Sequence, residues 1–155
     1  MQWYNKISSN PDDYSILADA LDYYELQLKD AREEINTKGK KIELLLKMLP
    51  GIAEYRFNQL QEIEAILRHL ELQLNHVRAK VYRNFLENYN RALSSRDAEK
   101  YCDTDQNVYD LSLLINRVAL IRNHYLGISK GLDVMNYQLS NVTKLRIAGM
   151  DDATL

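Results

Sequence analysis

One long stripe of apolar side chains constrains this chain more than any other feature of its sequence. Between residues 111 and 142, an apolar residue recurs at alternating steps of three and four. A stripe that repeats every 3.5 residues lies on one face of a helix and is buried only when another helix packs along it. The sequence therefore predicts packing of helix on helix. The stripe consists of Leu111, Leu114, Val118, Ile121, Tyr125, Ile128, Leu132, Met135, Leu139 and Val142.

The same spacing occurs twice more, from Tyr14 to Ile35 and from Leu60 to Val81. With 46% hydrophobic residues and only five Gly and two Pro in 155 residues, the chain has the composition of a one-domain helical protein. We expect an all-α fold of long antiparallel helices with coiled-coil-like packing. Either the helices bend and pack within one chain or, as we favour, an elongated protomer shares its stripes with other copies in a homo-oligomer. The residues expected at that interface are Leu114, Val118, Ile121, Tyr125, Ile128, Leu132 and Met135.

Prolines and glycines set the expected ends of the first two helices. Asn10 followed by Pro11 predicts a helix start, because a polar cap and a proline in the first turn are both typical there. The apolar spacing continues past Gly39, so we expect this helix to end only at Pro50 and the glycine after it. A second long helix is then predicted to run to Leu93.

Capping patterns set the remaining boundaries. Ser94 and Asp97 have the spacing of a capping box and predict a short helix. The last long helix is predicted to follow a polar connector and to end at Gly149. We expect an N-terminal helical arm over residues 1–49 and a helical core over residues 50–155, in one continuous all-α domain.

Positive charge is concentrated in the middle of the chain. Residues 1–67 hold eight Lys/Arg against twelve Asp/Glu, residues 68–101 hold seven against four, and residues 102–155 hold five against six. In the basic segment cations alternate with aromatic residues, a combination that holds single-stranded nucleic acid because cations contact phosphates while rings stack on unpaired bases. The alternative is that the rings extend the core stripe and the cations form a solvated helix face. The candidate DNA-binding residues are Arg78, Lys80, Arg83, Tyr89 and Arg91.

Catalytic and metal-binding patterns are weak, so we expect a non-enzymatic protein without cofactor or metal. The sequence has no glycine-rich phosphate loop, and His69 and His76 are too far apart along a helix to share one metal ion. Cys102 is the only cysteine, and the neighbouring Asp103 should raise the pKa of its thiol and keep it inert. No stretch approaches the roughly 18 apolar residues of a membrane span, and we expect a cytoplasmic protein with no membrane partner.

The order of features over roughly residues 49–150 resembles a known family. In chain order these features are Leu49-Pro50-Gly51, a long helix ending at Tyr89-Asn90, then Asp105-x-x-Val108, and finally Val142-x-Lys144-Leu145-Arg146-x-x-Gly149. This layout is similar to that of UvsY, the recombination mediator of T-even-type phages. The arm that precedes it is longer than the family requires.

The resemblance implies a specific role. UvsY-like mediators bind single-stranded DNA as ring-like homo-oligomers and help a RecA-like recombinase displace the single-strand-binding protein and form its filament. By position, the family's DNA-contacting stretch corresponds to Lys80 and Arg83, and its oligomerisation helix to residues 111–146. A phage-encoded protein of this kind acts in the host cytoplasm. The alternative hypothesis is a helical structural or assembly protein of a phage particle, in which the basic stretch is ordinary surface.

Overall fold

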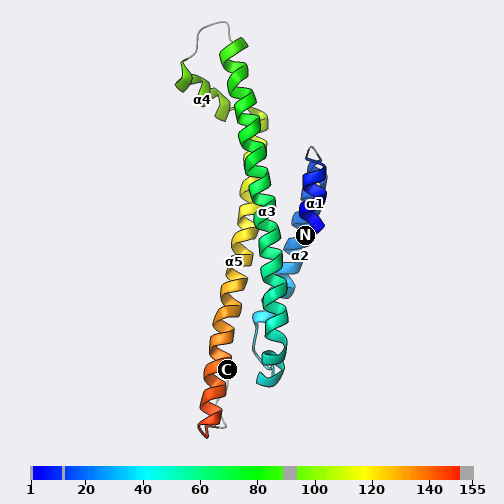
Figure 1. Cartoon of the computed structure of the whole chain (residues 1–155), viewed down its shortest axis with the longest axis vertical. Coiled ribbons are helices and arrows are strands. Elements are labelled where there is room, and N and C mark those ends of the chain that lie inside the picture. The colour runs from blue at the N-terminus through cyan, green and yellow to red at the C-terminus, as the bar shows by residue number, and fades with distance from the viewer. Residues whose placement is uncertain (1, 12, 89–93, 151–155) are drawn as a thin grey trace. The chain divides into compact units, whose positions relative to one another are not determined.

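The protein is all-α, as predicted. The computed structural model describes residues 2–11, 13–88 and 94–150, and these ranges contain five α-helices and no β-strand (Figure 1). The helices are α1 (Gln2–Ser9), α2 (Tyr14–Ile35), α3 (Ile42–Asn88), α4 (Ser95–Asp103) and α5 (Gln106–Ile147). They form two compact units, of which unit 1 comprises residues 1–62 and 121–155 and unit 2 comprises residues 63–120.

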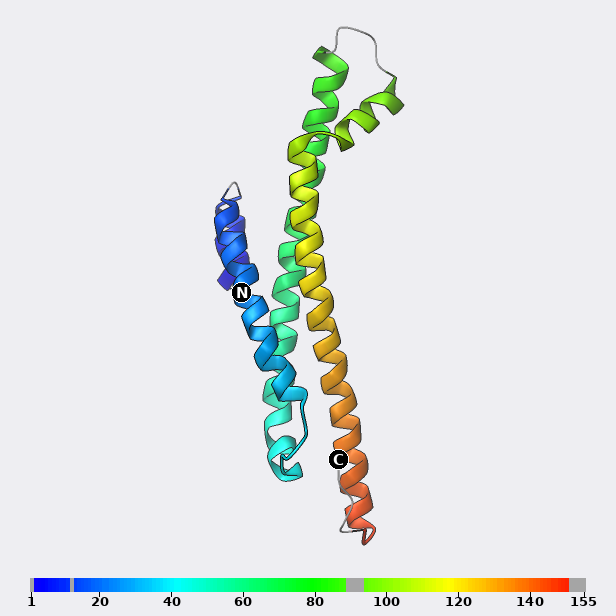
Figure 2. The same cartoon turned by 180° about the vertical axis from the view of Figure 1, so that it is seen from behind.

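The core of unit 1 forms where α2 meets the second half of α5. Tyr24 and Tyr125 are 1% and 0% exposed, and their rings meet edge to face with centroids 5.8 Å apart. The Tyr125 hydroxyl donates a hydrogen bond of 3.2 Å to the Tyr24 carbonyl oxygen. Burial raises the pKa of both phenols, so both hydroxyls stay protonated. Figures 1 and 2 show α2 running alongside the first part of α3, which completes this core.

A buried ion pair joins α2 to α3 in unit 1. The Arg56 side chain is 2% exposed, and its Nε and Nη2 each donate a 2.7 Å hydrogen bond to the Glu34 carboxylate. Its Nη1 donates to the side-chain oxygens of Gln27, at 3.1 Å, and Gln59, at 2.9 Å. Burial alone would lower the pKa of the guanidinium, but the bonds to Glu34 outweigh it and raise that pKa. Because a buried charge is tolerated only when it is paired, this pair favours one register of α2 on α3.

The short helix α1 was not predicted from the sequence. Two backbone N–H groups in its first turn, those of Trp3 and Tyr4, donate to the Glu62 carboxylate at 2.8 and 3.1 Å. Ile7 is 4% exposed and attaches the helix to unit 1. A helix of this length is marginal alone, and its capping carboxylate lies far away in the sequence. Local pattern reading therefore had no signal for it.

The predicted helix start at Asn10 is wrong. The N-cap of α2 is Asp13, whose side chain accepts the backbone N–H of Ser15 at 3.0 Å and its hydroxyl at 2.6 Å. These bonds hold the pKa of the Asp13 carboxyl below its usual value, with the hydroxyl bond as the larger cause. The aspartate competes successfully as the cap because it is charged and lies at the positive end of the helix dipole.

The predicted continuation of this helix past Gly39 is also wrong, since α2 ends at Ile35. Asn36 adopts an extended backbone conformation, and its side-chain oxygen accepts the N–H of Lys38 at 3.1 Å, a local bond that competes with the helix. Gly39 has a φ of +73°, which reverses the chain into α3. The apolar spacing resumes after this loop because Ile42 starts the next helix.

Pro50 lies inside α3 and does not end a helix, contrary to the prediction. A proline in a helix interior removes one backbone hydrogen bond and costs about 3 kcal/mol. Leu45 and Leu49 before it and Leu60 after it are all buried, at 4–6% exposed, so packing on both sides offsets this cost. The predicted end of the helix at Leu93 lies outside the described residues.

Unit 2 consists of the second part of α3, helix α4 and the start of α5. In both views α5 runs alongside α3 in the opposite direction within this unit (Figure 2). The predicted helix start is confirmed, because Ser94 is the N-cap of α4 and its hydroxyl oxygen accepts the N–H of Asp97 at 3.2 Å. The same hydroxyl donates to the Asp97 carboxylate at 2.6 Å. The buried apolar residues of the unit are Ile63, Ile66, Leu67, Leu70, Ala98, Cys102, Val108, Leu111 and Val118.

The ends of α5 follow the predicted pattern. Asp105 caps the start, where its side chain accepts the N–H of Asn107 at 2.9 Å. Gly149, with φ of +88°, ends the helix in a Schellman motif in which the N–H of Met150 bonds to the Leu145 carbonyl oxygen at 3.1 Å. Over the described residues, none of the helices combines the length and the hydropathy needed to cross a bilayer.

The long stripe of α5 is buried by its own chain. Nine of its ten residues are 0–7% exposed in the single protomer, and Leu114 is half-buried. We expected other copies to cover the stripe, but the structure covers it with segments of the same chain. Burial of this face therefore does not require a second copy, and the homo-oligomer stays a prediction that must rest on another surface.

Removing the carboxylate partner of Arg56 tests the buried ion pair. In Glu34→Ala the guanidinium remains buried without its counter-charge, so we expect the free energy of unfolding to fall by about 2–4 kcal/mol. Urea denaturation followed by circular dichroism measures the change. The exposed neighbour serves as the control, since Glu33→Ala should shift stability by no more than about 0.5 kcal/mol. Equal unfolding midpoints for the two variants would contradict a stabilising role for the pair.

Candidate nucleic-acid interface

The predicted DNA-binding residues that the structure describes lie at the end of α3 in unit 2. Arg78, Lys80 and Arg83 all belong to this helix. Lys80 and Arg83 are exposed, and the Arg78 side chain is 46% exposed. Tyr89 and Arg91 lie outside the described residues.

Helix geometry brings Lys80 and Arg83 together and separates Arg78 from them. At about 100° per residue, Lys80 and Arg83 lie about 60° apart around the axis and share one exposed face. Arg78 lies about 140° around the helix from Arg83. The exposed His76 falls on the same face as the first two cations. The three cations therefore do not form one patch.

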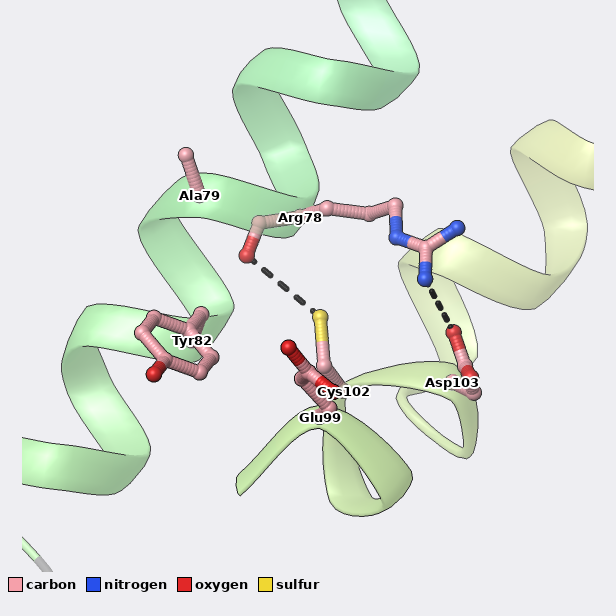
Figure 3. A pocket seen from close by; sticks show the side chains of 6 residues that line it. All are labelled: Arg78, Ala79, Tyr82, Glu99, Cys102 and Asp103. Carbon is pink, nitrogen blue, oxygen red and sulfur yellow. Dashed lines mark hydrogen bonds and ion pairs between the residues drawn. The ribbon is translucent and has the colours of Figure 1, made fainter. Parts of the chain in front are cut away.

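Arg78 instead belongs to a cleft between α3 and α4 (Figure 3). Its Nη2 lies 2.6 Å from a carboxylate oxygen of Asp103. The thiol of Cys102 approaches the Arg78 backbone carbonyl oxygen at 3.4 Å. The ion pair is exposed to water and therefore weak, so an incoming phosphate can replace the carboxylate. The cleft has a volume of about 540 Å³ and is lined by Arg78, Ala79, Tyr82, Glu99, Cys102 and Asp103.

The aromatic side chains of this region lie on the α4 side of α3. The rings of Phe85 and Tyr101 pack with centroids 5.6 Å apart and an interplanar angle of 31°. Tyr101 remains 42% exposed, while Tyr82 and Phe85 are half-buried. Lys80 and Arg83 are thus separated around α3 from Tyr82 and Phe85, whereas Arg78 lies on the same side as these two rings. The idea that Phe85 extends the core stripe fits its partial burial.

Two further cations lie on α4. Arg96 and Lys100 are exposed and four residues apart, so they share a face of this helix. The candidate site residues chosen from the sequence did not include them. Their spacing within the predicted short helix was the signal that could have placed them together. They add exposed positive charge to α4, and Tyr101 adds a partly exposed ring to the same helix.

The chemistry that these residues can perform is binding. Lysine and arginine contact phosphates as charges and hydrogen-bond donors, and an exposed tyrosine ring can stack on an unpaired base. Within the part of the chain that the structure describes, no group of three His, Cys, Asp or Glu side chains is placed to hold a metal ion.

The thiol of Cys102 is predicted to react slowly. Burial raises its pKa, and the nearby carboxylate of Asp103 adds to this rise while Arg78 opposes it. The direction agrees with the sequence expectation, but burial is the larger cause. Because only the thiolate is nucleophilic, we expect iodoacetamide to alkylate the folded protein at pH 8 more slowly than the urea-unfolded protein, and the folded rate to rise only at higher pH. Mass spectrometry counts the single adduct, and equal folded and unfolded rates at pH 8 would contradict the shift.

Comparisons with known protein families, with curated proteins and with solved structures find no significant match to this chain. The function must therefore be argued from the residues and the geometry. What they offer is a helical protein with exposed cations and a partly exposed aromatic ring at one end of unit 2.

Proposed function

We propose that this protein binds single-stranded DNA and acts as a non-enzymatic recombination mediator of the UvsY type. The observation that carries the proposal is that Lys80 and Arg83 share one exposed helix face. Both lie in residues 68–101, the one of the three sequence segments with a net positive charge. These are the positions to which the family resemblance assigns DNA contact. In this role the protein helps a RecA-like recombinase displace the single-strand-binding protein and form its filament.

Binding strength comes from several weak contacts acting together. One protomer with a few phosphate contacts binds weakly at physiological salt. Linking several copies raises the effective concentration of each further contact, so an oligomer binds one strand far more tightly without any new type of interaction. The proposal therefore includes a homo-oligomer.

The inner stripe of α5 is already buried within the protomer. The proposed oligomer therefore forms through the outer face of this helix, which exposes apolar side chains. In unit 2, Tyr109, Leu113 and Leu120 lie within about 40° of one another around the helix, on the side opposite the buried stripe. They are 50–56% exposed. In unit 1, the outer side of α5 likewise exposes Val134 and Tyr137, at 56% and 69%. Exposed apolar residues that recur along one helix face are typical of an interface between chains.

Loss of the two shared-face cations tests the DNA site. In Lys80→Ala with Arg83→Ala, we expect weaker binding of labelled oligo(dT) in fluorescence anisotropy. The slope of log affinity against log salt should become shallower by about 0.7 for each lost phosphate contact. The matched control is Lys29→Ala with Lys130→Ala, which removes two exposed lysines from unit 1.

The control should bind oligo(dT) like the original protein at both salt concentrations. Unchanged affinity and slope in the Lys80/Arg83 variant, with its oligomeric mass intact, would eliminate this site. A protein that binds no oligo(dT) in any form, and that sediments with phage particles, would favour the structural-protein alternative.

A second variant tests the outer face of α5. Leu113→Asp with Leu120→Asp places two charges on the exposed side, so we expect a smaller sedimenting mass with helicity preserved in circular dichroism. Val118→Asp serves as a contrast, because Val118 is 1% exposed and a charge there should reduce helicity itself. A monomeric original protein, or an unchanged mass in the double variant, would rule out this interface.

A further inference from the structure

Unit 1 carries a second cationic surface, formed by the loop between α2 and α3 and the end of α5. A cavity of about 350 Å³ opens there. Its lining contains four cationic side chains and one carboxylate, that of Glu43. The lining residues are Thr37, Lys38, Gly39, Lys40, Lys41, Ile42, Glu43 and Arg146. Residues 1–67 as a whole have a net negative charge, so a charge count over this segment does not reveal the local excess of positive charge.

The loop holds its lysines close together by local hydrogen bonds. The Lys40 backbone N–H donates to the Thr37 carbonyl oxygen at 3.1 Å, which closes the turn at Gly39. The Lys40 ammonium donates to the Glu33 carbonyl oxygen at 2.6 Å, at the end of α2. The loop is thus a defined turn that presents cations to solvent.

The only carboxylate in the lining is engaged by the only arginine. Arg146 Nη1 lies 3.3 Å from a Glu43 carboxylate oxygen, and the two side chains are 34% and 73% exposed. Such an exposed pair is weak, so another carboxylate can take the place of Glu43 on the guanidinium. An Asp or Glu side chain of a bound peptide can accept two hydrogen bonds from this guanidinium.

Exposed aliphatic side chains follow the loop in the first two turns of α3, next to the cavity lining in the sequence but not part of it. Leu44 and Met48 share one helix face, each 50% exposed, while Leu46, 41% exposed, lies on another face. Neither the lining nor these two turns contains an aromatic ring on which a base could stack. This surface therefore differs from the end of unit 2, where Tyr101 is exposed. Cations next to Leu and Met favour a peptide that combines acidic and apolar side chains.

We propose that this surface, the loop 37–41 with Arg146 and the first two turns of α3, docks an acidic polypeptide segment of a partner protein that also carries aliphatic side chains. Carboxylates of the segment contact Lys38, Lys41 and Arg146, and its aliphatic side chains cover Leu44 and Met48. The inference goes beyond DNA binding and does not depend on it.

The test uses the full-length protein and a fluorescein-labelled peptide that repeats two aspartates and one leucine. We expect Lys38→Ala with Lys41→Ala to weaken peptide binding about five- to tenfold, because each exposed charge pair contributes only modestly to affinity. Leu44→Ser with Met48→Ser should weaken the same peptide. Peptides with asparagine in place of aspartate, or serine in place of leucine, should bind more weakly than the parent peptide.

Two controls make the outcome specific. Lys29→Ala with Lys130→Ala removes the same charge from unit 1 outside the lining and should leave peptide affinity unchanged. Oligo(dT) should bind the Lys38/Lys41 variant as it binds the original protein. Equal peptide affinity in the original protein and the Lys38/Lys41 variant would overturn the proposal. So would loss of oligo(dT) binding with peptide binding intact, which would make the surface a DNA contact; failure of the Lys80/Arg83 site is measured separately.

Discussion

Burial of the inner stripe of α5 against segments of the same chain is the constraint on which the other features depend. Tyr125 lies at its centre, fully buried, with its ring against Tyr24 and its hydroxyl on the α2 backbone. Once this face is covered within the protomer, the apolar surface that α5 still offers to another molecule is its outer side. That side exposes Leu113 and Leu120 in unit 2, and Val134 and Tyr137 in unit 1.

Much of the fold could be predicted from the sequence because periodicity and caps are local properties. The apolar stripes gave the helical class, and Ser94 and Gly149 marked boundaries that the structure confirms. The errors concern boundaries where weak signals compete. At Asn36 a side-chain hydrogen bond ends a helix whose apolar spacing continues, and at Pro50 packing sustains a helix against a residue that usually ends one.

Features that depend on distant residues left no sequence signal. Glu62 caps α1 from another helix, and Arg56 meets Glu34 across the contact between α2 and α3. In the candidate site the residue types were predicted, but their grouping was not. Neighbouring residues in a helix point in different directions around its axis. Lys80 and Arg83 therefore occupy one face of α3, while Tyr82 and Phe85 face α4.

The two cationic regions, the end of unit 2 and the loop of unit 1, expose different uncharged side chains, and this difference bears on what each region can bind. Charge alone attracts any polyanion and does not distinguish a nucleic acid from an acidic peptide. Uncharged side chains in each region discriminate between these ligands. An exposed ring such as Tyr101 can stack on an unpaired base, whereas Leu44 and Met48 can pack against aliphatic side chains. Surfaces of unlike chemistry allow one chain to bind two kinds of polyanion without the two ligands competing for the same cations.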